Sequence, residues 1–261
     1  MNNGNKSARK AAMTSACALA LIVGGAWLMR SPESTAGSAA GSAERIAALE
    51  AAIVNARHQI ELVKDRDDVE ILVSAYGYYL DKSLWNQLAD LFADDGQIEI
   101  GTRGAYIGRE RIRAMLHTVY GVAGPKPDTL SNHMQLQPVI DVAPDGRTAK
   151  ARIRLLYQTG RYGKAASWGG GIYENEYVKN NGVWQIKKVK TYTTFVANYV
   201  GGWAKSPRQA NAAPSETFPP DIPPGPIVES FPNIYDFPFH YANPVTGRVT
   251  EIRAVVPATS R

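Results

Sequence analysis

The four histidines are the side chains of this 261-residue chain best suited to acid–base chemistry near neutral pH. A neutral imidazole has a pKa near ~6.5, so it can both donate and accept a proton. His58 and His117 fall on predicted helices, where surface positions are expected, and His240 lies in the C-terminal segment. His133 lies in a predicted strand, where it is either a structural residue or a group that transfers protons.

Two charged residues at predicted element boundaries could assist such chemistry. Asp81 breaks an apolar helical stripe, where it serves either as a helix cap or as a carboxylate that orients an imidazole. Arg103 stands between glycines in "GTRGAY" and could pair with a phenolate or alkoxide, with an ordinary surface position as the alternative.

Aromatic residues could line a substrate pocket beside these groups. Tyr157, Tyr173 and Tyr177 alternate along predicted strands, and Tyr79 lies on a predicted helix. Each of them either fills the core or supplies a phenolic hydrogen bond. Trp168, in "SWGGG", either lines the pocket opening or packs internally.

Several kinds of chemistry have no support in the sequence. Cys17 is the only cysteine and lies in the N-terminal leader, so a thiolate nucleophile is excluded. No phosphate-binding loop, dinucleotide fingerprint, metal-ligand spacing or nucleophile elbow is present. The net charge of +5 is not gathered into a basic stripe. We therefore expect no cofactor, no metal and no nucleic-acid partner.

The first 43 residues have the composition of a targeting segment. Residues 1–10 are polar and basic, residues 11–29 carry no charge, and small residues occupy positions 38–43. This order is typical of a secretory signal, and the uncharged run approaches the ~20 residues that span a bilayer. Residues 1–43 are thus predicted to be a signal peptide or a membrane anchor. Either places the rest of the chain in the periplasm or on the inner membrane facing it.

Residues 44–66 are predicted to form an amphipathic, coiled-coil-like helix. Its apolar residues occupy a and d positions of three heptads: Ile46, Leu49, Ile53, Ala56, Ile60 and Val63. This helix either lies on the domain or forms a self-associating stalk. Residues 65–68 are acidic and polar, and are predicted to begin a new helix.

Residues 67–200 are predicted to be one α+β domain. Helices are expected over 69–80, 84–92 and 109–120, a short strand over 97–100, and four longer strands over 130–140, 148–160, 168–179 and 183–194. Helices that cover one face of a curved antiparallel sheet form a cone, whose open end is a ready pocket. Residues 201–261 hold 11 of the 16 prolines, and 228–248 are predicted to be an arm that packs on the domain or on a neighbouring subunit.

The domain resembles the SnoaL-like family of the nuclear-transport-factor-2-like superfamily. The similar segments are "DDVEILVSAYGYYLDKSLWNQLADLFA", "YIGRERIRAML" and "GGGIYENEYVKNNGVWQIKKVKTYTTF". The resemblance implies the cone fold and self-association into a homo-oligomer. It does not fix the reaction, because the family contains dehydratases, isomerases, cyclases, lyases and binding proteins.

The same resemblance implies a catalytic pair. "LDKSLW" is similar to the segment that carries a catalytic Asp in scytalone-dehydratase-like members, which places it at Asp81; "SNHMQLQP" resembles the strand of their catalytic His, which places it at His133. In those enzymes the pair moves protons through a water molecule. Tyr157 stands where the dehydratase has a second His, and Leu80 and Ile100 stand near its pocket tyrosines, so scytalone itself is not the expected substrate.

The closing hairpin, "GGW" and the Pro-rich tail also look like the sphingomonad diarylpropane lyases, which release formaldehyde from lignin-derived dimers without a cofactor. The chain is therefore predicted to be a cofactor-independent lyase of a hydrophobic phenolic molecule. The alternatives are a dehydratase or isomerase of a polyketide- or steroid-like substrate, and a non-catalytic binding or assembly module of the cell envelope.

Overall fold

The computed structural model describes residues 33–208, 213–225, 230–233 and 239–250, with side chains from Gly41 onward. The chain divides into two compact units, Met1–Ala52 and Ile53–Arg261. Most of the predicted leader, residues 1–32, lies outside the described residues. Over the described part of the chain, no helix combines the length and apolar character needed to cross a membrane.

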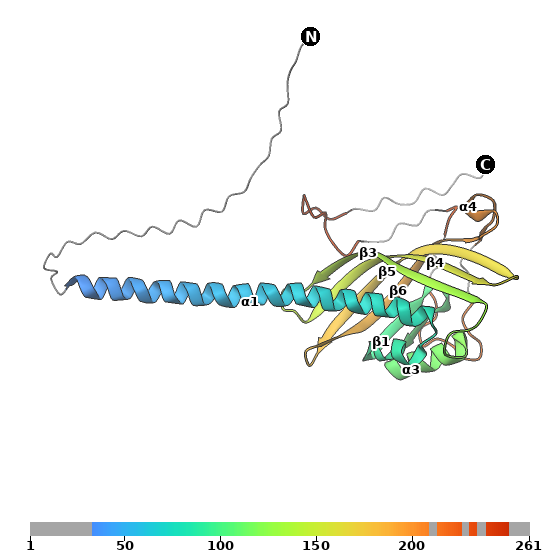
Figure 1. Ribbon diagram of the computed structural model, residues 1–261, viewed down its shortest axis with the longest axis horizontal. Coiled ribbons are helices and arrows are strands. Elements are labelled where there is room, and N and C mark those ends of the chain that lie inside the picture. The colour runs from blue at the N-terminus through green and yellow to red at the C-terminus, as the bar shows by residue number, and fades with distance from the viewer. Residues whose placement is uncertain (1–32, 209–212, 226–229, 234–238, 251–261) are drawn as a thin grey trace, which may run out of the picture. The chain divides into compact units, whose positions relative to one another are not determined.

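The longest element is helix α1, which runs without interruption from Glu33 to Asp81 (Figure 1). The predicted start of a new helix at residues 65–68 is therefore wrong. Asp65 is buried inside α1, where its Oδ1 accepts hydrogen bonds from Lys179 Nζ and Trp184 Nε1. An aspartate that serves as an anchor in the middle of a helix has the same sequence signature as one that caps a helix. The small residues 38–43 are helical as well.

Helix α1 ends at Asp81, close to the predicted end at residue 80, and two short helices follow it. Residues 82–83 form a turn, in which Ser83 has a positive φ of 51°. Helix α2 follows at Trp85–Asp90, and α3 at Arg109–Met115 continues as a π-helical turn over Leu116–Tyr120. Trp85 Nε1 donates to Gly121 O at 2.8 Å and so ties α2 to the chain after α3.

The sheet contains seven strands: six follow the order β2-β1-β6-β5-β4-β3, and the short β7 pairs with β6. The strands are β1 (Phe92–Ile100), β2 (Ala105–Ile107), β3 (Thr129–Val142), β4 (Thr148–Arg161), β5 (Ala165–Asn180), β6 (Val183–Asn198) and β7 (Pro207–Arg208). A 3₁₀ turn, Gly101–Arg103, joins β1 to β2, and α4 (Gly202–Lys205) follows β6. The pairing is antiparallel except between β1 and β6, which run parallel. The predicted curved antiparallel sheet is confirmed, with this one parallel pair within it.

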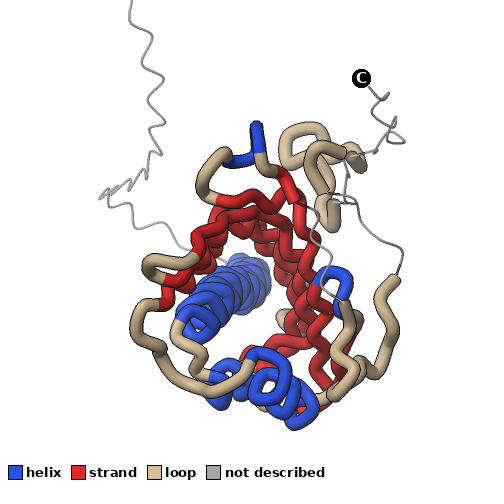
Figure 2. Tube along the Cα trace, turned by 90° about the vertical axis from the view of Figure 1, so that its right-hand side faces the viewer, coloured by secondary structure: helices blue, strands red, loops and turns tan. Residues whose placement is uncertain are grey.

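The sheet bends around α1 without closing (Figure 2). Register shifts in β3, in β5–β6 and in β1 mark where the strands bend, as β-bulges do. The main core lies between α1 and the concave face: Val69, Val73 and Tyr76 of α1 join Ile153, Tyr173 and Val189 of the sheet. This is the predicted α+β cone, with an N-terminal helix and a C-terminal arm.

The described parts of the C-terminal arm contact the domain, which is one of the two alternatives expected for residues 228–248. Phe231 N donates to Thr194 O at 2.7 Å. His240 Nδ1 lies 3.0 Å from Glu174 Oε2, and its Nε2 lies 3.2 Å from Asp141 Oδ2. These contacts fix the arm across β3, β5 and β6.

Candidate active site

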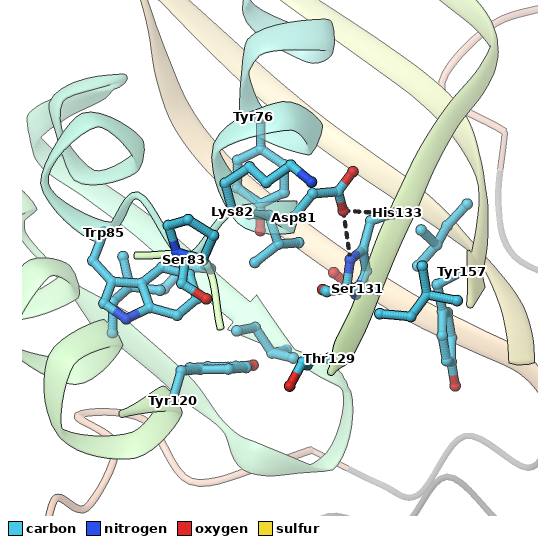
Figure 3. A pocket seen from close by; sticks show the side chains of 18 of the residues that line it. Tyr76, Asp81, Lys82, Ser83, Trp85, Tyr120, Thr129, Ser131, His133 and Tyr157 are labelled. Carbon is cyan, nitrogen blue, oxygen red and sulfur yellow. Dashed lines mark hydrogen bonds and ion pairs between the residues drawn. The ribbon is translucent and has the colours of Figure 1, made fainter. Parts of the chain in front are cut away.

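A pocket of about 440 Å³ opens between the end of α1, the π-helical turn and the concave face of the sheet (Figure 3). Apolar side chains and hydroxyl groups line most of it. Its polar and aromatic lining residues include Tyr76, Asp81, Lys82, Tyr120, His133, Tyr157, Tyr173, Thr191 and Thr193. A mostly apolar cavity with a few convergent polar groups is the usual form of a small-molecule site.

Asp81 and His133 meet inside this pocket. Asp81 is the last residue of α1, and its Oδ1 accepts a hydrogen bond from His133 N at 2.6 Å. The same oxygen lies 3.0 Å from His133 Nδ1. The side chains of His133 and Asp81 are only 20% and 13% exposed. Because a carboxylate only accepts hydrogen bonds, Nδ1 must carry the proton, which leaves the lone pair on Nε2.

Burial of the ring favours the neutral imidazole. Desolvation lowers the pKa of His133 and outweighs the hydrogen bond and the charge of Asp81, which raise it. The ring is therefore unprotonated at neutral pH, and Nε2 is available as a general base.

Tyrosines surround the pair. Tyr157, paired with His133 across β3 and β4, stacks on the imidazole with ring centroids 5.8 Å apart. Tyr76, Tyr120 and Tyr173 also line the pocket, and desolvation raises the pKa of each phenol. These phenols stay protonated at neutral pH and can donate hydrogen bonds to developing negative charge.

A glycine makes room for Tyr157. Gly169 faces Tyr157 in the neighbouring strand β5. A Cβ at position 169 would lie 2.4 Å from the Tyr157 hydroxyl and 2.7 Å from Phe195 O. The first glycine of "SWGGG" is thus explained by its close packing against Tyr157.

Four predicted site residues lie outside the pocket lining. Arg103 packs over the ring of Tyr120, 5.5 Å from its centroid. Tyr79 packs against the core, and Tyr177 is buried in it and accepts a hydrogen bond from Asn175. Trp168 packs against Trp203 and Phe195. It occupies the strand position next to Gly169, so its side chain leaves the opposite face of the sheet from Tyr157.

Sequence reasoning missed several lining residues. Tyr76 belongs to the apolar stripe of α1, which predicted only a core position, and Tyr120 ends the helix after β2. Lys82, Thr191 and Thr193 carried no signal, because their placement follows from the curvature of the sheet. His133, Asp81, Tyr157 and Tyr173 are brought together as predicted.

Comparison with known proteins gives a family and a set of similar folds. Residues 61–190 match the family model described as SnoaL-like domain. Among curated proteins, no sequence matches this one.

Two solved structures from the genus Novosphingobium are similar. A candidate scytalone dehydratase from Novosphingobium aromaticivorans DSM 12444 is 20% identical, with a TM-score of 0.48 over 60% of this chain and 97% of that one. The hexachlorocyclohexane dehydrochlorinase LinA-type3 from Novosphingobium barchaimii LL02 is 18% identical, with a TM-score of 0.47 over 55% of this chain and 95% of that one. Likeness at this level of identity concerns the fold and says nothing about the reaction.

Proposed function

Since the chain carries a SnoaL-like domain over residues 61–190, we propose that its cone is the active site of a cofactor-independent lyase. The substrate class is a hydrophobic phenolic small molecule, such as a lignin-derived aromatic dimer. The observation that carries this proposal is the buried Asp81–His133 pair, which faces a pocket lined by tyrosines.

His133 acts as the general base in this proposal. Its Nε2 takes a proton from the substrate, while Asp81 holds the ring and stabilises the imidazolium that forms. Tyr157 stacks on the ring, and Tyr120 or Tyr173 donates to the oxygen on which negative charge develops. Burial of His133 and Asp81 strengthens the interaction between them, because solvent screens buried charges less.

A 1,2-diarylpropane-1,3-diol with a para-phenol would react in two steps, dehydration and then loss of formaldehyde. Loss of the phenolic proton and of the benzylic hydroxyl releases one water molecule and leaves a quinone methide. His133 then takes the proton of the primary alcohol, and the carbon–carbon bond to that carbon breaks to release formaldehyde. The bonding electrons pass to the quinone methide, which becomes the phenol of a stilbene after protonation. No oxidant or reductant is consumed.

The same base could serve a dehydratase or isomerase, so the products must be identified. The protein is incubated with a panel of phenolic lignin dimers without added cofactor, and formaldehyde and stilbene are assayed. We expect both products from the unaltered chain and neither from His133→Ala with its fold intact by circular dichroism. Formaldehyde release that survives in His133→Ala would contradict the assignment of the base. No turnover of any dimer would contradict the substrate class.

A further inference from the structure

An apolar seam runs along α1 outside the pocket-bearing core. Ile46, Leu49, Ile53, Ile60 and Val63 are each more than half exposed, from 52% to 65%. Their spacing alternates between three and four residues, and Ala56 completes the series. Five large apolar side chains in one line on a helix exceed the scattered exposure that ordinary surfaces show.

The domain contacts the other face of α1. His58 Nε2 lies 2.8 Å from Pro144 O, Asp65 bonds to Lys179 and Trp184, and Val69 is fully buried. At about 3.6 residues per turn, these three positions lie roughly half a turn from Ile60 and Val63. Ile53, Ile60 and Val63 therefore lie on the side of α1 that faces away from the domain. The seam is open to a partner that does not compete with the domain.

We propose that the seam pairs with the same seam of a second copy of this chain, as a parallel two-stranded coiled coil over residues 46–63. The a positions are all isoleucine: Ile46, Ile53 and Ile60. β-Branched residues at a favour two parallel strands. The next a and d positions are Asp67 and Glu70, so the seam ends where the domain begins to cover α1.

The charges beside the seam fit the parallel, in-register arrangement. Arg45 occupies a g position and Glu50 the following e position. In a parallel dimer, g of one helix lies beside e of the next heptad on its partner, so Arg45 and Glu50 form two symmetric ion pairs. The other complete g and e sets, Ala52 with Arg57 and Gln59 with Lys64, place no like charges together.

Sedimentation equilibrium of the full chain tests the seam. We expect twice the chain mass of 28.4 kDa for the unaltered protein, and the monomer mass for the double variant Ile53→Glu, Ile60→Glu. Val54→Glu is the matched control, because Val54 is 66% exposed but occupies a b position, and it is expected to remain a dimer. Near-ultraviolet circular dichroism should show the same folded domain in all three proteins, whereas only the double variant should lose the stability that the paired helices contribute. A monomeric unaltered chain, or a double variant that remains dimeric, would overturn the proposal.

A charge exchange tests the direction of the helices. Arg45→Glu places a second carboxylate beside Glu50 at both contacts of the parallel dimer and should weaken it about tenfold. Adding Glu50→Arg restores opposite charges at both contacts and should return the dissociation constant to within about twofold of the original. A double exchange that is as weak as Arg45→Glu alone would overturn the parallel register.

Discussion

Asp81 and His133 are joined twice through one oxygen: Asp81 Oδ1 accepts from the backbone N–H of His133 at 2.6 Å and lies 3.0 Å from its Nδ1. The first bond fixes the β3 backbone against the end of α1, and the second fixes the imidazole ring. The chain between these two residues contains α2, β1, β2 and α3. The geometry of the base therefore depends on how the helical half of the domain meets the sheet.

Replacing Asp81 by Asn should separate these two contributions. Asn keeps an acceptor for the His133 backbone but loses the charge that stabilises an imidazolium and selects the Nδ1–H tautomer. We expect kcat to fall about 10²-fold to 10⁴-fold, with KM nearly unchanged. Steady-state kinetics on the dimer substrate measures this. Asp67→Asn, at an exposed position of α1, is the control and should retain full activity. Activity of Asp81→Asn within about twofold of the unaltered enzyme would exclude the proposed role.

The lowered pKa of His133 predicts the acid limb of the pH profile. The general base must be unprotonated, so kcat/KM should rise through a pKa below the usual ~6.5 and reach its plateau before neutral pH. The same lowered pKa also makes the stability of the fold depend on pH. The unfolded chain binds a proton at ~6.5 that the folded chain binds less readily, so the contribution of His133 to stability is complete above ~6.5 and falls below it. A limb above ~6.5 would contradict the burial argument.

The elements of the domain follow from sequence patterns, whereas the pairing within the site does not. Alternation along residues 168–194 and the Asn181-Gly182 turn predict the β5–β6 hairpin, and both turn residues have positive φ. Taken alone, the sequence left His133 and Asp81 open to structural roles. Their pairing was predicted only through the family resemblance, because no local signal links residues so far apart in the chain.

The wrong and missing predictions have local physical causes. Asp65 looks like a cap because acidic residues often begin helices, but a long-range hydrogen bond from Trp184 was not visible in the sequence. The parallel β1–β6 pair was not predicted at all, because it requires a crossover whose course the strand pattern does not specify. The sequence did not decide whether Trp168 lines the pocket or packs internally, because nothing in it showed that the neighbouring Gly169 faces Tyr157. Successive side chains of a strand point to opposite faces of the sheet. The sequence therefore cannot say which of them enter the pocket until one inward-facing residue is known.

Gly169→Ala tests whether the space behind Tyr157 matters for the site. The new Cβ would approach the Tyr157 ring and Phe195 O more closely than van der Waals contact allows, so Tyr157 must move or the strands must separate. We expect a loss of stability of about 1–3 kcal/mol and reduced kcat/KM. Chemical denaturation and kinetics measure both. Gly163→Ala controls for the loss of a glycine, because no atom lies within 4 Å of its Cβ, although its positive φ makes alanine strained there. Unchanged activity in Gly169→Ala would show that the position of Tyr157 is not critical.

Asp65 should be the main polar anchor between α1 and the sheet. Burial alone would raise the pKa of its carboxyl, but hydrogen bonds from Lys179 and Trp184 lower it, so the group is ionised and paired at neutral pH. Asp65→Ala leaves the Lys179 ammonium and the buried Trp184 N–H without this acceptor. We expect unfolding in urea to require about 3 kcal/mol less free energy.

Asp68→Ala is the matched control on the next turn of α1, because its ion pair with Lys64 is exposed and should contribute little. Equal destabilisation by the two substitutions would mean that the buried contacts of Asp65 contribute no more to stability than the exposed Asp68–Lys64 ion pair. A larger loss for Asp65→Ala would establish that α1, and with it Asp81, is held on the sheet from this point.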